Sequence, residues 1–562
     1  MIGPTLPISE EIHSQKYRGE GESFEEAMIR NAGALSDNDQ HYDKILDVFT
    51  NMRFLPAGRV QSAMGSTRSV TPYNCFVSQT IEDSMDSIMD GATKAAHTMR
   101  LGGGIGYDFS KLRPRGDRIV SLDSVSSGPI SFMGIYDAIC KTISSAGHRR
   151  GAQMGVLRVD HPDIEEFIRC KQNEHILTQF NISVGITDAF MTAVVNDTEF
   201  ELVFDGRVYK RISATALWEE IMRSTWNWAE PGVLFLDRIN NYNNLYYCEE
   251  LAATNPCGEQ PLPPNGACLL GSFNLTKYIK TDNAGKRYFD YGLFENDIPH
   301  VVRAMDNIVD RAIYPLDAQR YEAEAKRRMG LGVTGLANAG ESLGLPYGTP
   351  RFVRFQEDVL HRLVNKAYVA SAKLAQEKGA FPLYDKDKYM AGNFVQTLDE
   401  PTRKLIAKHG IRNSHLTSIA PTGTISLSAN NISSGIEPVF AHRYDRAVNT
   451  LRGAIVEEVS DYAYREWEVE GRVTADLSAK DHLNVLIAAQ KYTDSAVSKT
   501  CNVSPDMPWD EFKMLYIDAW KGGCKGITTF NPGGKREGIL NVNDETEGAA
   551  CWINPDGSKS CE

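Results

Sequence analysis

The chain has 562 residues, of which 42% are hydrophobic and 24% charged, the balance of a globular protein with a large core. The formal net charge of -13 argues against non-specific binding to DNA, RNA or anionic membranes, because phosphate groups attract a basic surface. No run approaches the ~20 apolar residues of a membrane span and the start lacks a signal-peptide pattern, so we expect a cytoplasmic protein. The ten cysteines are scattered through the chain, unlike a secreted disulfide framework.

Periodic apolar residues predict a helical N-terminal segment over residues 1–53, in which Ser23-Phe-Glu-Glu26 has the pattern of a capping box. Short strands alternating with long helices follow, which predicts a parallel α/β core. Strands are expected at 179–185, 200–204 and 416–420, and helices at 83–100, 129–145, 217–228, 298–312, 352–378 and 481–491.

Glycines are dense in Leu101-Gly-Gly-Gly104-Ile-Gly106. This run does not match the G-x-G-x-x-G pattern, which argues against a Rossmann dinucleotide site. Such a run instead indicates close approach to the backbone by a neighbouring element or by a ligand. A second glycine-bounded loop, Gly147-His-Arg-Arg150-Gly151-Ala152, is basic. An ordinary solvated turn is at least as plausible for this loop as a site that binds phosphate through its arginines.

The most informative run is Asn255-Pro256-Cys257-Gly258-Glu259, which Cys268 follows. Its carboxamide and its carboxylate each lie two residues from the sulfur, and alternate residues of an extended segment or tight loop can face one cavity. A single cysteine is ordinarily a buried structural thiol, but an ionisable carboxylate beside it is costly to bury without purpose.

Thiolate catalysis uses a neighbouring imidazole, and this run holds no histidine. Glu259 also disfavours a thiolate by charge repulsion. We therefore expect Cys257 to react as a neutral species, including as a thiyl radical, with Glu259 as a general base for a substrate hydroxyl.

A candidate anion site lies at Pro421-Thr422-Gly423-Thr424-Ile425, after a strand-like run and before an expected helix start. Small residues let backbone N–H groups converge on an anion, and a helix end adds its dipole. From this run alone an ordinary capped turn is equally plausible, and the Walker pattern is absent. Patterns for H-E-x-x-H, Cys-x-x-Cys, EF-hand and D-x-H-x-x-G sites are absent as well, so we expect no metal site.

Together these residues resemble the large catalytic subunit of ribonucleotide reductase, from about Leu55 to about Leu540. The motifs stand in the order of that family, and agreement of so many by chance is implausible. They are Asn74-Cys75-Phe76-Val77, Glu82-Asp83-Ser84-Met85-Asp86-Ser87, the glycine-rich run with Leu112-Arg113-Pro114, Arg149-Arg150-Gly151-Ala152, the Cys257 run, Cys268 with Ser272-Phe-Asn-Leu275, and Pro421–Ser426 followed by Ser434-Gly-Ile-Glu-Pro438.

The resemblance implies a ten-stranded α/β barrel of two five-stranded parallel halves over residues 54–541, with a central finger loop. The segment 1–53 is too short for the family's ATP-binding cone, which takes roughly a hundred residues, so we expect no such activity site. Residues 542–562 are polar and rich in Asn, Asp, Gly and Glu, which predicts a flexible arm. By the resemblance this arm is a redox tail.

In this family a Cys257 thiyl radical would take the 3′ hydrogen of a ribonucleotide, Glu259 the 3′-hydroxyl proton, and Asn255 would hydrogen-bond the sugar. The 2′-hydroxyl would leave as water, while Cys75 and Cys268 supply two electrons and become a disulfide. The tail cysteines Cys551 and Cys561 would then reduce that pair by thiol–disulfide exchange, and a dithiol such as thioredoxin would regenerate them. The nine residues between the tail cysteines are more than the family's usual spacing.

Substrate contacts carry over as Asn74 and Gly104 on the sugar and base side, and as residues 421–425 for the phosphates. Asp83 and Arg113 match positions that bind a deoxynucleoside triphosphate effector at a homodimer interface near 85–99 and 129–146. Arg150 matches the loop that relays effector identity to the substrate. The dimer-type motifs favour diphosphates over triphosphates.

The radical generator distinguishes members of this family. A separate radical subunit needs a tyrosine pair near the end of the barrel, but the matching Lys525-Gly-Ile-Thr-Thr-Phe-Asn531 holds none, and a glycyl-radical signature is not evident. Elimination leaves adenosylcobalamin as the cofactor. The alternatives are a two-subunit enzyme with an unusual relay, and a catalytically silent nucleotide-binding protein, against which the retained cysteines argue.

Overall fold

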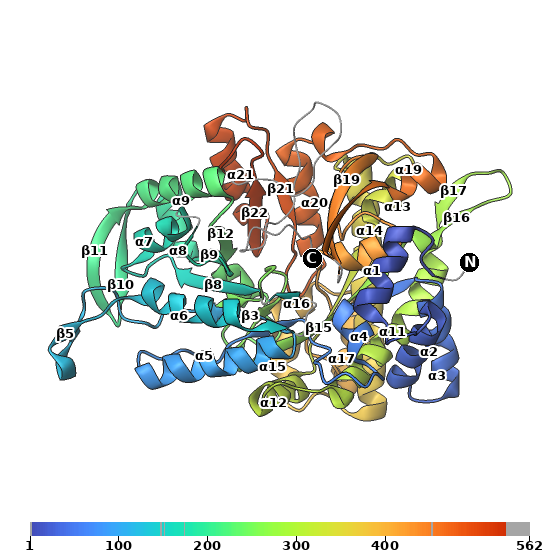
Figure 1. Ribbon diagram of the computed structural model, residues 1–562, viewed down its shortest axis with the longest axis horizontal. Helices are drawn as coiled ribbons and strands as arrows, with labels where there is room; N and C mark the ends of the chain where they lie inside the picture. Colours follow the sequence, from blue (N-terminus) through green and yellow to red (C-terminus); the bar gives the residue numbers. More distant parts are fainter. Residues whose placement is uncertain (1–2, 146–148, 151, 173–174, 451–452, 536–562) are drawn as a thin grey trace.

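A ten-stranded sheet, in which most neighbouring strands run parallel, forms the centre of the computed structural model (Figure 1). The structure describes residues 3–535 except 146–148, 151, 173–174 and 451–452. Across the sheet the strands are β1 (Phe54–Pro56), β15 (Ala267–Asn274), β2 (Cys75–Val77), β3 (Gly104–Asp108), β8 (Gln153–Arg158), β9 (Phe180–Ile186), β12 (Gly232–Phe235), β22 (Gly526–Phe530) and β21 (Thr500–Asn502), with β18 (Met329–Thr334) also beside β15.

The parallel pairings confirm the expected α/β core, and three pairings are antiparallel: β1 with β15, β15 with β2, and β12 with β22. Every residue of β15 is buried, as is usual for a strand that helices cover on both faces. The expected strand at 179–185 is β9.

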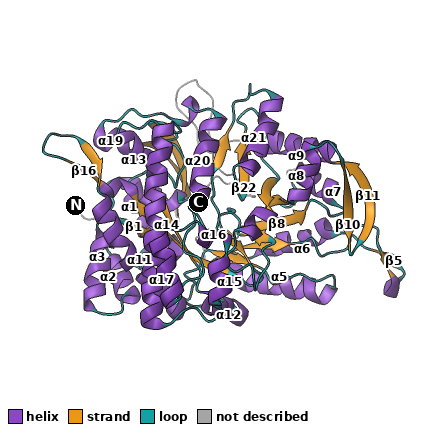
Figure 2. Ribbon diagram, turned by 180° about the vertical axis from the view of Figure 1, so that it is seen from behind, coloured by secondary structure: helices purple, strands orange, loops and turns teal. Residues whose placement is uncertain are grey.

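Helices surround the sheet (Figure 2). The helices expected from periodicity correspond to α5, α6, α9, α11, α14 and α20, which confirms them. The helices are α1 (Pro7–Tyr17), α2 (Phe24–Leu35), α3 (Asp39–Thr50), α4 (Gly58–Ala63), α5 (Met85–Arg100), α6 (Pro129–Thr142), α7 (Ile164–Arg169), α8 (Asp188–Val195), α9 (Ala214–Trp228), α10 (Leu236–Asn241), α11 (Tyr291–Arg311), α12 (Asp317–Lys326), α13 (Leu336–Ser342), α14 (Pro350–Lys378), α15 (Lys386–Ala391), α16 (Asn393–Gln396), α17 (Glu400–His409), α18 (Gly423–Ser428), α19 (Tyr462–Trp467), α20 (Ala479–Lys491) and α21 (Trp509–Lys521).

The N-terminal helices α1 to α3 lie together on one side of the molecule, coloured blue in Figure 1. The predicted capping box starts α2: the Ser23 hydroxyl accepts from the Glu26 amide at 3.2 Å, and the Glu26 carboxylate accepts from the Ser23 amide at 2.8 Å. Helix α1 packs on α18, where the Ser9 hydroxyl donates to the Leu427 carbonyl at 2.6 Å.

Two of the expected strands differ from the prediction. Residues 200–204 belong to β10 (Glu199–Phe204), which pairs only with β11 (Arg207–Ser213) and lies outside the main sheet. Its Glu199 and Glu201 are exposed, so this strand cannot be buried on both faces as a central parallel strand is.

Residues 416–420 form no named strand and make only isolated bridges. The Leu331 amide donates to the Leu416 carbonyl at 2.8 Å, and the Ile419 amide donates to the Ala496 carbonyl at 3.2 Å. This segment therefore joins β18 to residues 495–498, which lead into β21.

Small two-stranded sheets decorate the core: β4 (Arg118–Ile119) with β5 (Ser124–Val125), β6 (Ser144–Ser145) with β7 (Arg149–Arg150), β13 (Ala253–Thr254) with β14 (Pro261–Leu262), β16 (Ile279–Thr281) with β17 (Arg287–Phe289), and β19 (Arg443–Thr450) with β20 (Gly453–Ser460). Within the described ranges, no helix combines the length and apolar character that crossing a membrane requires.

Candidate active site

The Cys257 run forms the turn between β13 and β14. Asn255 closes this turn: its amide donates to the Gln260 carbonyl at 3.1 Å, and its side-chain oxygen accepts from the Gln260 amide at 2.9 Å. Gly258 has a φ of 82°, a left-handed conformation that favours glycine. The sequence therefore fixes a tight hairpin with Cys257 near its tip.

The glycines of β3 let this hairpin lie directly against the sheet. A Cβ atom on Gly106 would lie 1.7 Å from the carbonyl oxygen of Thr254, and one on Gly104 would lie 3.1 Å from Cγ of Pro256. The close approach expected of the glycine-rich run is thus made by the Cys257 hairpin, backbone against backbone at Gly106.

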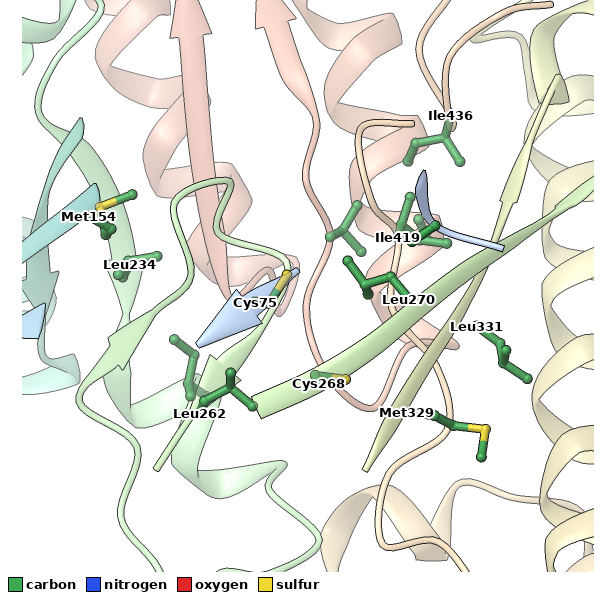
Figure 3. Packing of buried hydrophobic residues seen from close by; sticks show 14 of the residues in the cluster. Cys75, Met154, Leu234, Leu262, Cys268, Leu270, Met329, Leu331, Ile419 and Ile436 are labelled. Atoms are coloured by element: carbon green, nitrogen blue, oxygen red, sulfur yellow. The ribbon is translucent and has the colours of Figure 1, made fainter. Parts of the chain in front are cut away.

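Cys75 and Cys268 lie directly opposite one another where β2 pairs with β15 (Figure 3). Opposed residues of antiparallel strands have Cβ atoms about 4.5–5.5 Å apart, close to the separation that a disulfide requires. Both thiols are buried and reduced here, and burial raises the pKa of Cys268 well above its ordinary value of 9.0. Cys268 is therefore held as a neutral thiol, and the strands of the pair already have the register for a disulfide.

The Cys257 hairpin meets this dithiol through its two flanking polar residues. The Asn255 side-chain amide donates to the sulfur of Cys75 at 3.2 Å, and the Cys75 thiol faces Glu259 Oε1 at 3.8 Å. Asn255 and Glu259 are 1% and 2% exposed. The structure thus brings the Cys75 thiol, the Asn255 carboxamide and the Glu259 carboxylate together in the buried interior.

A cavity of about 1140 Å³, called here the first cavity, opens beside these groups. It contains every residue expected to contact substrate, and it adds residues that sequence reasoning missed: Lys16, Tyr17, Arg59 and Ser62. These come from α1 and α4, and no local motif marks them. The predicted residues that line it are Asn74, Cys75, Gly104, Asn255, Cys257, Glu259, Pro421, Thr422, Gly423, Thr424 and Ile425.

The loop at 421–425 closes one side of this cavity. Thr422 is left-handed, with a φ of 57°, and its hydroxyl accepts from the Gly435 amide at 2.6 Å while bonding to the Thr334 hydroxyl at 2.9 Å. The expected helix does begin here, but α18 is only six residues long. The Thr422 side chain therefore holds the loop in place, and the backbone of the loop faces the cavity.

A second cavity of about 600 Å³ lies on another side of the hairpin, and Cys257 lines it too. Its walls include the aliphatic side chains of Ile182, Val233 and Ile527. Its buried Lys499 donates to Glu437 Oε2 at 2.6 Å, so this ammonium is paired. Cys257 is thus shared by two cavities.

The stretch 525–531 places Thr528 in the wall of this second cavity. Tyr516 is a single tyrosine upstream of this stretch. Its side chain is buried, and its phenol oxygen lies 2.8 Å from the Thr529 hydroxyl. Residues 525–531 contain no tyrosine. Thr528, which lines the second cavity together with Cys257, has a small side chain.

The other predicted residues lie away from these cavities. Arg113 Nε donates to Asp83 Oδ2 at 2.6 Å, so the two candidate effector residues form an ion pair, each about one-third exposed. The backbone of Arg150 lies in β7, opposite Ser144. Cys551 and Cys561 lie outside the described residues.

A sequence model described as ribonucleotide reductase, barrel domain, matches residues 73–530. The chain is 34% identical over 570 residues to the vitamin B12-dependent ribonucleoside-diphosphate reductase of Mycobacterium tuberculosis, across 94% of this chain and 79% of that protein. It is 33% identical to the protein of the same name in Thermoplasma acidophilum, across 96% and 72%. For the vitamin B12-dependent ribonucleotide reductase of Streptomyces coelicolor the identity is 27%, across 84% and 57%. The chain belongs to the ribonucleotide reductase family.

Proposed function

We propose that this chain reduces ribonucleoside diphosphates to 2′-deoxyribonucleotides through a Cys257 thiyl radical, with adenosylcobalamin as the radical generator. The observation that carries the proposal is the position of Cys257, which lines the first cavity with Glu259, Asn255 and Cys75 and also lines the second cavity, while Cys268 lies opposite Cys75 in the sheet. The relatives named vitamin B12-dependent reductases support this assignment.

On the substrate side, the residues of this chain divide the chemistry between them. The Cys257 thiyl takes the 3′ hydrogen, Glu259 accepts the 3′-hydroxyl proton, and Asn255 orients the sugar through its amide. Loss of the 2′-hydroxyl as water leaves a sugar that needs two electrons and protons. Cys75 and Cys268 supply them and become a disulfide, for which their opposed strand positions require little movement. The Cys257 thiol then returns a hydrogen atom to C3′, which completes the product and restores the thiyl radical.

Adenosylcobalamin bound at the second cavity would supply the one-electron oxidation of Cys257. The residues there fit the apolar and polar parts of an organic cofactor: Ile182, Val233 and Ile527 offer aliphatic contacts, and Thr528 leaves space where a larger side chain would fill it. Ser183 and Asn181 would hold its polar groups. The alternative, a two-subunit enzyme, lacks its tyrosine relay in residues 525–531.

We also propose that the sheet closes into the family's ten-stranded barrel of two halves over 54–541. The bridges from β18 through 417–419 to residue 497 support this closure, since the chain enters β21 three residues later. The segment 1–53 and the tail 542–562 would flank the barrel. Cys551 and Cys561 would reduce the buried dithiol and pass on electrons from a dithiol such as thioredoxin.

For regulation we propose a deoxynucleoside triphosphate effector at Asp83 and Arg113, with Arg150 on the loop that relays its identity. A homodimer through α5 and α6 would complete this site. Met85 and Met89 of α5 support the dimer, because they expose 56% and 43% of their surface on one helix face.

The test is to incubate the purified chain alone with adenosylcobalamin, a dithiol and each ribonucleoside diphosphate, and to measure deoxynucleotides by chromatography. We expect product without any second polypeptide. Product that appears only when a radical-generating subunit is added would refute the cobalamin assignment. No product under either condition, with nucleotide binding intact, would favour the silent nucleotide-binding protein.

A further inference from the structure

The first cavity has two basic side chains that the catalytic chemistry does not use, Lys16 of α1 and Arg59 of α4. We propose that they bind the terminal phosphate of the substrate, so that α1 and α4 determine how strongly substrate affinity depends on the phosphates. This inference rests on the proposed function, because it takes a ribonucleotide as the ligand, and it adds a specificity determinant from outside the barrel motifs.

Two cationic side chains and one carboxylate line the first cavity. Among the described residues that line it, the charged side chains are Lys16, Arg59 and Glu259. Glu259 lies with Cys75 at the sugar position. A protein with a net charge of -13 repels a nucleotide unless cations lie near its phosphates, and these two residues are the cations on that wall.

Arg59 has a defined place relative to the catalytic hairpin. A Cβ atom on Gly102 would lie 2.3 Å from Cζ of Arg59, so the guanidinium packs flat against a turn where glycine is required, with a φ of 95°. Two residues further, Gly104 packs against Pro256 of the hairpin. Arg59 and the catalytic hairpin thus lie against the same glycine-rich run, and both line the first cavity.

Lys16 reaches the same wall because α1 is fixed on both sides. Ser9 ties α1 to α18, the helix that follows the loop at 421–425. A Cβ atom on Gly58 would lie 2.5 Å from the Tyr17 ring, so the end of α1 also lies against the start of α4. These contacts bring Lys16 and Arg59 to one cavity together with Thr424.

The loop at 421–425 cannot neutralise a phosphate by itself. The Thr422 hydroxyl is engaged by Gly435 and Thr334, and the loop contributes no charged side chain. Neutral backbone donors can orient a phosphate, whereas the planar guanidinium of arginine adds two parallel charge-assisted hydrogen bonds. The loop and the two cations therefore complement each other.

The experiment is calorimetric titration of the full chain with a ribonucleoside and its mono-, di- and triphosphate. For Arg59→Gln we expect diphosphate affinity to fall roughly 10- to 100-fold, the value of one charged hydrogen-bonded contact, and ribonucleoside affinity to stay unchanged. Lys16→Gln should show a smaller loss of the same kind. In both variants KM should rise more than kcat falls.

Lys44→Gln is the matched control, since it removes one positive charge from an exposed position of α3 in the same segment. It should leave every affinity unchanged. Because Arg59 also packs on Gly102, Arg59→Lys and Lys16→Gln provide variants less prone to misfold, and thermal unfolding checks each one. Diphosphate affinity equal to wild type in Lys16→Gln and in a folded Arg59→Gln would overturn the proposal. Failure of the reductase assignment would appear differently, as wild-type chain that binds nucleotides and yields no product.

Discussion

The two cavities that share Cys257 are built from different materials. The first is walled by glycines, by hydroxyl side chains and by the buried pair of Asn255 and Glu259, so polar groups of a substrate can meet the backbone itself. The second takes much of its lining from β9, β12 and β22, and it mixes aliphatic side chains such as Ile182 and Val233 with the charged Glu230 and Lys499. Under the proposed function, proton transfer belongs to the cavity with Glu259 and one-electron chemistry to the other, on separate sides of one sulfur.

The largest effect is expected for Cys257→Ser, which removes the one reactive side chain that lines both cavities. A serine hydroxyl does not form an oxygen radical under conditions that oxidise a thiol, so we expect deoxynucleotide formation to fall to background. Nucleotide titration should give wild-type affinity. Measurable turnover by this variant would refute the radical mechanism.

Glu259→Gln alters only the first cavity. It keeps the shape of the side chain but removes its ability to accept the 3′-hydroxyl proton, so kcat should fall roughly 10²- to 10⁴-fold, the usual contribution of a general base. Steady-state kinetics measure this change, and KM should move little. A kcat within tenfold of wild type would mean that another group takes the proton.

Gly106→Ala tests whether backbone contact positions the hairpin. Its new Cβ would meet the Thr254 carbonyl at 1.7 Å, so the hairpin must shift, and a displacement of about 1 Å in a catalytic group can reduce the rate ~100-fold. Gly33→Ala in α2 is the matched control, because its Cβ would meet no atom within 4 Å and Gly33 lines neither cavity. Equal activities for the two variants would contradict this explanation.

Thr528→Phe fills the second cavity and leaves the first intact. We expect cobalamin affinity, measured from the visible absorbance of the corrin, to fall at least ~10-fold because of the added volume. Diphosphate affinity should be unchanged. Loss of nucleotide binding with cobalamin binding intact would show that the two cavities are assigned the wrong way round.

The last prediction concerns the stability of the fold rather than activity or binding, and it rests on Lys525. Its ammonium donates to the Ser495 carbonyl at 2.7 Å, and the next residue, Ala496, donates its amide to the Glu259 carbonyl at 3.0 Å. Burial lowers the pKa of Lys525 to about 8 from an ordinary value of 10.5. Between these values the unfolded chain binds more protons, so stability should rise with pH across this window.

The rise amounts to about 3 kcal/mol of unfolding free energy, with the penalty fully present below pH 8 and relieved above pH 10.5. Denaturant unfolding of wild type and Lys525→Met over this range measures it. The difference between the two proteins should change with pH, since methionine has no proton to lose. A constant difference would mean that Lys525 keeps its ordinary pKa.

The sequence predicts the hairpin well because its chemistry is local: Asn255, Cys257 and Glu259 are neighbours in the chain and Gly258 allows the turn. Helices with a clear apolar stripe, such as α14, are predicted equally well. The contributions of Lys16 and Arg59 could not be predicted, since they depend on contacts between α1 and α18 that no local pattern records. The expected strand at 200–204 forms outside the main sheet, where Glu199 and Glu201 alternate with less exposed residues, and no motif marks Thr528 in the wall of the second cavity.

The hydrogen bond between Ser9 and Leu427 joins residues 418 positions apart. α1 is therefore synthesised long before α18. Until α18 is made, Ile8 and Ile12, which are buried in the folded protein, stay exposed to solvent or are bound by chaperones. The wall that carries Lys16 is finished only after Leu427 has been made. A nascent chain thus meets its nucleotide late, after the surroundings that contain a reactive sulfur have been assembled.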